Sequence, residues 1–419
     1  MNAPSELQAQ LDTEGWLALP SDLVAHFGLE PGVQVRVDKR TSGLHLRQPV
    51  TYLGKVYIEP TNACNLDCRT CIRNVWDEAL GRMTRETFAH IVEGLRAFSP
   101  SPTVFFGGFG EPLAHSDIVE MVTQVKALGA PVELITNGTL LTESLSRQLI
   151  KAGVDVLWVS LDGATPESYT DVRLGAALPQ VIDNVMGFRS ARPPAQCPTP
   201  EIGIAFVAMK RNVADLPAVL RLGGRLGASR FMISNVLPYT PQMRDEVLYT
   251  RALHDALYVP SRWAPAPQVS LPKMDWNETT REPLYRVMRS SHNVTLAGAN
   301  LGHASDRCPF IESSVTAIGW DGCLSPCLPL LHSHTSYVNE RERFSRRYVV
   351  GNVNERKLHE LWNEPAYLAF RERVQKFDFS PCTFCGGCNL SEINEEDCFG
   401  NTFPTCGGCL WAQGVIQCP

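Results

Sequence analysis

The sequence predicts an α/β protein whose main sheet has six parallel strands, arranged as a partial barrel or as an open sheet. Three observations support this prediction. Strand-like and amphipathic helix-like segments alternate six times over residues 51–240. A β-rich stretch with turn signals precedes them at residues 1–50, and ten of the fourteen cysteines follow from Cys308 onward. We therefore expect an α/β core between a small all-β unit and a cysteine-rich domain at residues 301–419, with residues 241–300 as a linker or cap.

Length, charge and cysteine content limit the class of protein. A chain of 419 residues can form two or three domains. The net charge of −6, from 38 basic and 44 acidic residues, gives no overall attraction to nucleic acid. The sequence contains neither an apolar run of about 18 residues nor the apolar core of a signal peptide. Without a secretory route, fourteen cysteines indicate metal clusters rather than disulfides. We expect a cytoplasmic, oxygen-sensitive metalloprotein with no membrane partner.

Residues 1–50 contain three short strand-like segments, Trp16–Leu19, Val33–Val37 and Leu44–Arg47, separated by Pro20, Pro31-Gly32 and Ser42-Gly43. A short helix ending in Phe-Gly-Leu lies between the first two. This order resembles the SpoVT/AbrB-type swapped-hairpin domain. The resemblance implies a homodimer through residues 1–50, because so short a segment buries too little surface alone.

Members of that family often bind DNA, so the basic residues of this unit are candidates for phosphate contacts. They are Arg36, Lys39, Arg40 and Arg47. The alternative is that they are ordinary exposed charges of strands and turns. We favour the alternative, since the surrounding sequence has no excess of positive charge.

The core has six predicted strands and four clear amphipathic helices. The strands are Val56–Glu59, Thr103–Phe106, Val132–Thr136, Val156–Ser160, Gly203–Ala208 and Phe231–Asn235. The helices are Arg85–Phe98, Ile118–Leu128, Ser144–Ala152 and Leu216–Leu226. Parallel strands joined by right-handed crossovers place functional loops at their carboxyl ends.

The first strand is followed by three cysteines, Cys64, Cys68 and Cys71, in the run CNLDCRTC. A [4Fe–4S] cluster has four irons to ligate, so three thiolates leave one iron open for a small molecule. A structural zinc site is the alternative. It would need a fourth ligand, and the nearest histidine, His90, lies in a predicted helix. The spacing therefore favours an iron–sulfur cluster with an open iron.

Three further motifs follow the next strands: FGGFGEP at residues 106–112, Thr136-Asn137-Gly138, and Ser160-Leu161-Asp162-Gly163 with Arg173 beyond it. Together with the cysteine loop, they resemble the radical SAM enzymes. The resemblance implies a partial (β/α)6 TIM-like barrel and an enzyme that reductively cleaves S-adenosylmethionine (SAM) to a 5′-deoxyadenosyl radical. It also implies an electron donor such as ferredoxin or flavodoxin.

The resemblance assigns seven residues to SAM: Gly107, Gly108, Gly110, Glu111, Asn137, Ser160 and Arg173. The glycines would let backbone carbonyls approach the methionine ammonium. Asn137 and Ser160 suit ribose hydroxyls, and Arg173 suits the carboxylate. Glu111 either accepts from the ammonium or holds its loop. Thr70 stands where many members have an aromatic residue against adenine, so the adenine contact is unassigned.

The remaining cysteines, with Gly322, Gly351-Asn352-Val353 and Leu361-Trp362, resemble the SPASM extension of radical SAM enzymes. They are Cys308, Cys323, Cys327, Cys382, Cys385, Cys388, Cys398, Cys406, Cys409 and Cys418. The resemblance implies one or two auxiliary [4Fe–4S] clusters, and the alternative is one cluster plus a zinc site on pairs such as Cys406–Cys409. Our division gives Cys308 and Cys327, with the last segment, to the first cluster. Cys382, Cys385, Cys388 and a later cysteine would form the second.

Two details concern the substrate. Sulfatase-maturing relatives have an aspartate after the cysteine that matches Cys327, and here Leu328 replaces it. Residues 401–419 look like the end of maturases encoded beside tungsten-dependent oxidoreductases. We therefore expect a maturase that modifies a peptide or protein, with a tungsten-dependent oxidoreductase as the candidate target. The alternatives are an enzyme of small-molecule cofactor biosynthesis and a redox-responsive DNA-binding regulator, which would not need a complete SAM site.

Overall fold

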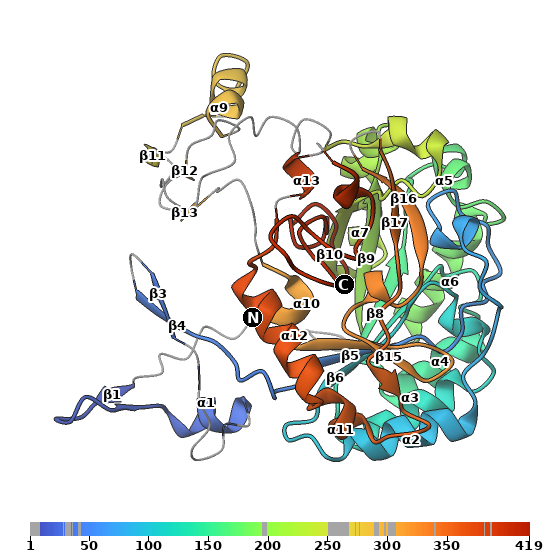
Figure 1. The fold of residues 1–419 in the computed structure, drawn as a ribbon. Coiled ribbons are helices and arrows are strands. Elements are labelled where there is room, and N and C mark those ends of the chain that lie inside the picture. The colour runs from blue at the N-terminus through green and yellow to red at the C-terminus, as the bar shows by residue number, and fades with distance from the viewer. Residues whose placement is uncertain are drawn as a thin grey trace.

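The computed structural model describes residues 9–27, 29, 35, 37–40, 43–194, 199–249, 268–272, 274–275, 277–288, 293–296, 299–300, 307–338, 341–380, 382–385 and 388–419, some of them by their backbone alone. Figure 1 shows an α/β core with a cysteine-rich C-terminal part against it and smaller elements to one side. Within the described residues, no helix has the length and apolar character needed to span a bilayer.

The core strands form one nine-stranded sheet in the order β10-β9-β8-β7-β6-β5-β14-β15-β18. The six consecutive parallel strands are β5 (Lys55–Ile58), β6 (Thr103–Phe106), β7 (Val132–Thr136), β8 (Val156–Ser160), β9 (Glu201–Ala208) and β10 (Ala228–Asn235). All five residues of β8 are buried, as expected for a strand covered on both faces. The predicted α/β fold with a mostly parallel sheet is confirmed.

Helices cover the convex side of this sheet (Figure 1). They are α2 (Arg85–Leu95), α3 (Ile118–Lys126), α4 (Glu143–Ala152), α5 (Pro166–Val172), α6 (Leu178–Ala191) and α7 (Leu216–Arg225). The bounds follow local sequence: Thr142 caps α4 by accepting from the Leu145 amide, and Gly153, with φ +94°, ends it. The prediction did not name α5 and α6. Both helices lie in the segment between β8 and β9 and are joined by a short turn.

Three strands beyond residue 300 extend the core sheet, so the C-terminal part shares this sheet with the core. The strands are β14 (Val315–Ile318), β15 (Cys323–Ser325) and β18 (Gly351–Asn352). β14 pairs parallel with β5, and β15 and β18 add antiparallel pairs. One hydrophobic core accordingly includes Val56 of β5 and Trp362 of the C-terminal part. The two regions fold as one body around a shared sheet.

The rest of the C-terminal part consists of short helices and one hairpin. The elements are α10 (Pro309–Glu312), η5 (Leu328–Leu330), β16 (His334–Val338), β17 (Arg341–Ser345), α11 (Leu358–Trp362), α12 (Pro365–Lys376), α13 (Cys382–Cys385) and η6 (Asn389–Glu392). The last residues lie on the concave side of the sheet. Asn235 of β10 donates to the Val415 carbonyl at 2.9 Å, and Lys55 of β5 donates to the Pro419 carbonyl at 3.0 Å.

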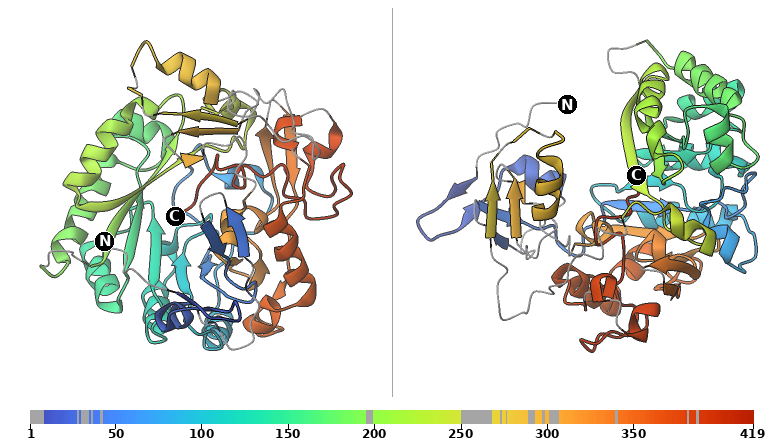
Figure 2. Two further views of the ribbon diagram at one scale, coloured as in Figure 1. Left: turned by 90° about the vertical axis from the view of Figure 1, so that its left-hand side faces the viewer. Right: turned by 90° about the horizontal axis from the view of Figure 1, so that it is seen from above.

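The segment predicted as a linker or cap, residues 241–300, has regular structure of its own. It contains η4 (Pro241–Glu246), α9 (Arg281–Met288) and a three-stranded sheet of β11 (Gln268–Leu271), β12 (Asn293–Leu296) and β13 (Ala299–Asn300). The sequence has no clear period there, which is why these short strands were not predicted. Figure 2 shows α9 and the three-stranded sheet to one side of the α/β core, where the N-terminal hairpins also lie.

In the described residues of the N-terminal unit there are two hairpins and one helix. They are β1 (Gln10–Leu11) with β2 (Leu17–Ala18), α1 (Ser21–His26), and β3 (Val37–Arg40) with β4 (Gly43–Leu46). Two predicted strands are therefore shorter or shifted by a residue, and most of Val33–Val37 lies outside the described residues. Of the basic candidates, Arg36 and the side chains of Lys39 and Arg40 also lie outside them, and Arg47 is ion-paired with Glu312. The swapped-hairpin dimer stays a prediction.

Candidate functional site

The cysteine loop follows β5 and is held in place by its own backbone and two side chains. The Cys71 amide donates to the Cys68 carbonyl at 3.1 Å, and Asn74 Nδ2 donates to the same carbonyl at 3.0 Å. Arg73 donates to the Leu66 carbonyl at 3.1 Å. These contacts turn Cys64, Cys68 and Cys71 toward one cavity of about 200 Å³. The three thiols lie where the sequence placed them, after the first strand.

The surroundings of the thiols fit an iron–sulfur cluster. Burial raises the pKa of Cys64, and it raises that of Cys71 to about 11, so both thiols need a bound cation to ionise. Two donors reach the sulfurs: Asn137 Nδ2 lies 3.9 Å from Cys64 Sγ, and Arg173 lies 3.8 Å from Cys68 Sγ. Hydrogen bonds to sulfur are a usual feature of cluster sites. His90, in α2, contacts Asn354 at 3.2 Å instead of this loop.

The glycine-rich loop after β6 forms a second wall of the cavity, and two of its glycines are required by close contacts. Gly108 has φ +131°, and a Cβ there would lie 2.7 Å from Glu59 Cγ. A Cβ on Gly110 would lie 2.1 Å from the Thr61 carbonyl oxygen. Both residues line the cavity, whereas Gly107 packs against Phe105 outside its lining. The loop can present backbone to a ligand only with these glycines in place.

Glu111 holds the loops after β6 and β7 together. Its carboxylate accepts from the Thr136 hydroxyl and the Asn137 amide, both at 2.8 Å, and from the Leu113 amide at 3.0 Å. Only 2% of this side chain is exposed, and burial raises its pKa. Of the two roles considered for Glu111, these contacts support holding the loop, since its acceptors are already engaged.

Asn137, Ser160 and Arg173 reach the same cavity from the ends of β7 and β8 and from α5. Asn137 donates to Asn65 Oδ1 at 3.0 Å. Arg173 forms a buried ion pair with Asp162 at 2.6 Å, and Asp162 also accepts from the Val207 amide. Asp162, to which the sequence motif assigned no role, thus orients the guanidinium.

The cavity also has apolar lining that the sequence left unassigned. Thr70 lies in the wall, and the apolar side chains around it are Leu66, Ile72, Phe109, Ile135 and Tyr239. Tyr239 was missed because it lies beyond the last core strand. It contacts His334 with ring centroids 5.6 Å apart.

A second group of thiols lines a smaller cavity of about 60 Å³, to whose wall β16 and β17 also contribute side chains. Its members are Cys308, Cys327, Cys406 and Cys409. Burial raises the pKa of Cys308 to about 12 and raises those of the other three. Four thiols around one cavity match the ligand number of a closed cluster. No three His, Cys, Asp or Glu side chains of the described chain are arranged to hold a single metal ion.

The charge of this second site is set by Arg343 of β17, which the sequence analysis missed. Its side chain is 8% exposed and donates to the Gly408 carbonyl, while its Nε has no partner among the described atoms. The thiols within electrostatic reach of it are those of Cys382, Cys406 and Cys409. A buried guanidinium needs an anion, and a cluster with four thiolates supplies one.

The other cysteines whose side chains the structure describes do not line this cavity. Cys382 contacts Ser380 at 2.9 Å and is within electrostatic reach of Cys398, while Cys388 is exposed. Cys385 ends α13, and its side chain lies outside the described residues. Cys418 accepts from Trp411 Nε1 at 3.3 Å, beside Lys55. Cys323 accepts from Asn352 at 3.4 Å. Neither Cys418 nor Cys323 lines either cavity.

A partial parallel barrel with three thiols after its first strand and a glycine loop after its second defines a radical SAM protein. Residues 58–195 match the radical SAM superfamily, and residues 308–389 match the SPASM iron–sulfur cluster-binding domain. The chain belongs to the radical SAM superfamily and is an enzyme of that superfamily. Its cofactors are S-adenosylmethionine and a [4Fe–4S] cluster, and its SPASM domain binds iron–sulfur clusters.

Among particular proteins, the chain is similar to the tungsten-containing aldehyde ferredoxin oxidoreductase cofactor-modifying protein of Pyrococcus furiosus. The two are 30% identical over 369 residues, which is 87% of this chain and 96% of that protein. The chain is also 26% identical over 346 residues to the AdoMet-dependent heme synthase of Methanosarcina barkeri, covering 79% of this chain and 89% of the other. The structure of Streptococcus suis SuiB bound to S-adenosylmethionine shares the fold, with a TM-score of 0.52 at 17% identity, covering 83% of this chain and 73% of that one.

Proposed function

We propose that the protein is a maturase that uses radical chemistry to modify a tungsten-dependent oxidoreductase. The modified group is either the polypeptide of that oxidoreductase or the tungsten cofactor that the polypeptide carries. The observation that carries this proposal is the similarity to the Pyrococcus furiosus cofactor-modifying protein, which extends over 96% of that protein. The replacement of the expected aspartate by Leu328 supports a target other than a sulfatase. A ferredoxin or flavodoxin would supply the electron.

In this proposal the residues of the first cavity divide the work. Cys64, Cys68 and Cys71 hold the cluster. A cluster held there would supply, with SAM bound, the electron for the reductive cleavage of SAM. The backbone at Gly108 and Gly110, with the remaining polar lining, binds SAM and keeps water out. These polar residues are Asn137, Ser160 and Arg173.

The auxiliary cysteines divide in the proposal by the cavity they line. Cys308, Cys327, Cys406 and Cys409 hold the first auxiliary cluster. Cys382, Cys385, Cys388 and Cys398 hold the second, since Cys382 and Cys398 interact, Cys385 ends α13, and Cys388 follows it by three residues. Cys418 would then be free of cluster ligation. Iron should reach about twelve per chain if three four-iron clusters form.

Mass spectrometry of the target tests the proposal. The reconstituted enzyme, with SAM and reductant, is incubated with the cofactor-free oxidoreductase polypeptide and, separately, with the isolated tungsten cofactor. A mass change on the polypeptide supports protein modification, and one on the cofactor supports cofactor modification. Formation of 5′-deoxyadenosine with no mass change on either would contradict the proposed target.

The second candidate is a step in small-molecule cofactor biosynthesis. It is supported by the near full-length similarity to a heme synthase, which covers 79% of this chain. Incubation with a porphyrin substrate in place of the polypeptide separates this candidate from the first.

Deleting residues 1–46 is expected to leave SAM cleavage intact and to reduce the molecular mass in solution from dimer to monomer. The deletion ends before Arg47 because residues 47–51 pack on the C-terminal part: Arg47 pairs with Glu312, and Arg371 and Trp362 donate to the carbonyls of Val50 and Thr51. Light scattering after gel filtration measures the mass. A full-length chain that is already a monomer would contradict the swapped-hairpin prediction.

The DNA-binding alternative is tested on the same pair of proteins. If the N-terminal unit binds DNA, the affinity of the full chain for duplex DNA should weaken steeply as the salt concentration rises. The deletion should abolish this binding. Absence of a salt-dependent affinity in the full chain would exclude phosphate contacts by the N-terminal unit.

A further inference from the structure

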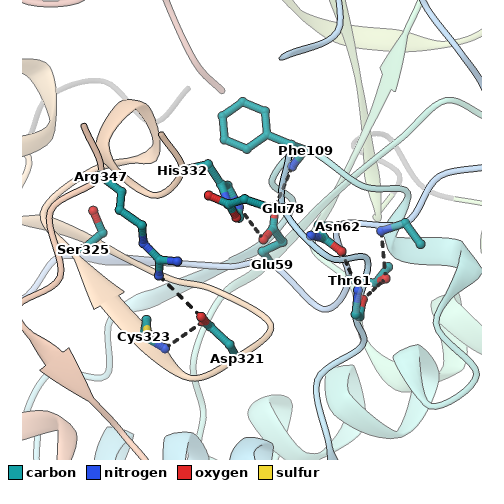
Figure 3. Close-up of polar contacts among 12 residues, drawn as sticks. Glu59, Thr61, Asn62, Glu78, Phe109, Asp321, Cys323, Ser325, His332 and Arg347 are labelled. Carbon is teal, nitrogen blue, oxygen red and sulfur yellow. Dashed lines mark hydrogen bonds and ion pairs between the residues drawn. The ribbon is translucent and has the colours of Figure 1, made fainter. Parts of the chain in front are cut away.

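A histidine lies between two carboxylates next to the first cavity, in a position that the proposed chemistry does not use. His332 Nε2 lies 2.8 Å from Glu59 Oε2, and its Nδ1 contacts Glu78 (Figure 3). The imidazole is 3% exposed. Because each ring nitrogen faces a carboxylate oxygen, both are donors, which is the hydrogen-bonding pattern of an imidazolium ion.

The three side chains come from three segments that build the site. Glu59 follows β5, directly before the cysteine loop, and its other oxygen accepts from the Phe109 amide at 2.9 Å. Glu78 belongs to the segment after the cysteine loop, which Asn62 holds through Ala79 and Gly81. His332 belongs to the C-terminal part. One imidazole therefore joins that part to both loops of the SAM cavity.

The contact between Glu59 and the glycine loop leaves little room for adjustment. A Cβ on Gly108 would lie 2.7 Å from Glu59 Cγ, so the carboxylate packs directly against the loop. Two aromatic rings enclose the imidazole: the ring centroids of Trp76 and Phe109 lie 4.4 Å and 5.6 Å from it. A shift of His332 must move Glu59 and, with it, Phe109, which lines the cavity.

His332 is also tied to the second thiol cavity by a short stretch of chain. Cys327, which lines that cavity, precedes η5 (Leu328–Leu330), and His332 follows two residues after η5. The Leu330 amide donates to the Cys327 carbonyl at 3.3 Å, and the Leu330 carbonyl accepts from Tyr348 at 2.9 Å. Leu330 thus holds this segment through both its amide and its carbonyl.

From these contacts we infer that His332 is a positioning residue through which the C-terminal iron–sulfur part sets the conformation of the SAM-binding loop 107–111. The ion pairs with Glu59 and Glu78 keep the loop in the conformation that binds SAM. This inference rests on the assignment of that loop to SAM. It further implies that occupancy of the second thiol cavity, through Cys327 and η5, is linked to SAM affinity.

The charge on His332 makes its contacts with Glu59 and Glu78 depend on pH. The flanking carboxylates raise the pKa of His332 to about 9 against the opposing effect of burial. The other charged or titratable groups nearby are Arg347, which pairs with Asp321 at 3.4 Å and acts on Glu78, and His334, whose pKa burial lowers to about 4. His332 gains stability from the charged form, so the contact is complete below pH 6.5 and is lost as pH rises through about 9.

The test replaces His332 with glutamine and compares the affinity for SAM by equilibrium dialysis on the reconstituted protein. Glutamine has donors at one end only and carries no charge. Loss of one charged hydrogen bond corresponds to a weakening of roughly tenfold or more. The ratio of wild-type to variant affinity should fall toward one between pH 8 and 10. The ratio is compared because titration of the amino group of SAM affects binding to both proteins equally and so cancels. The control His90→Gln, on the exposed face of α2, should show no such change.

A second readout does not depend on SAM or on activity. Hydrogen exchange of the backbone at residues 107–111 should be faster in His332→Gln than in the wild-type protein, and unchanged in His90→Gln. If the glutamine variant does not fold, Glu78→Gln, whose side chain is 24% exposed, gives the same comparison. Equal affinity ratios at all pH values, together with unchanged exchange of the loop, would overturn the inference. Failure of the wild-type protein to bind SAM would instead refute the assignment of the loop.

Discussion

Cys68→Ala is expected to abolish the cleavage of S-adenosylmethionine to 5′-deoxyadenosine. Cys68 is the central cysteine of the loop and is 8% exposed, with Arg173 3.8 Å from its sulfur. With only two thiolates, two of the four irons of the cluster would have no protein ligand, and the loop could not hold it. Iron should fall by about four per chain, and the activity should fall to background, as measured by chromatography of the nucleoside.

Cys323→Ala is the matched control for this experiment. Cys323 is half-buried and accepts one hydrogen bond from Asn352, but it lines neither thiol cavity. We expect its replacement to leave both iron content and cleavage unchanged. Cleavage that survives in Cys68→Ala, or that is lost in Cys323→Ala, would contradict the division of the thiols.

The sequence predicted the strands that carry the SAM site closely, for a physical reason. Strands such as Val132–Thr136 and Val156–Ser160 are rich in apolar residues and are followed by Gly-, Asn- or Asp-containing turns, and the structure has the same bounds. Their periodicity and their ends are local properties of the chain. The grouping of the polar loop residues was also predictable, because the carboxyl ends of parallel strands meet at one edge of the sheet.

The residues that the sequence did not reveal depend on partners far along the chain. His332 meets Glu59 across 273 residues, and neither stands in a pattern that would indicate the other. A charged residue at the end of an apolar strand, as Glu59 is, was the one available signal. β14 and β15 are short, and their place beside β5 is set by tertiary packing rather than by their own composition.

Arg343→Met is expected to have opposite effects on the iron-free and the iron-loaded protein. In the iron-free chain the thiols around Arg343 are protonated at neutral pH, because burial holds the pKa of Cys308 at about 12 and those of its neighbours high. The guanidinium is then a buried charge with one carbonyl as partner. Methionine of similar length removes the desolvation cost, which exceeds the lost hydrogen bond. We expect the free energy of unfolding of the iron-free chain to rise by about 1 kcal/mol.

With the cluster bound, the same substitution removes the cation that faces the thiolates Cys406, Cys409 and Cys382. A nearby positive charge stabilises the more negative, reduced state of a cluster. The loss of Arg343 should therefore lower the reduction potential of the first auxiliary cluster, whose cavity Arg343 lines. Urea unfolding of the iron-free protein and a potentiometric titration followed by electron paramagnetic resonance measure the two effects. Arg346→Met is the control, because Arg346 is exposed and paired with Glu395, and it should change neither quantity by much. Loss of stability by several kcal/mol in the iron-free Arg343→Met chain would mean that the charge is compensated without a cluster. The anionic group that Arg343 requires would then be part of the polypeptide itself.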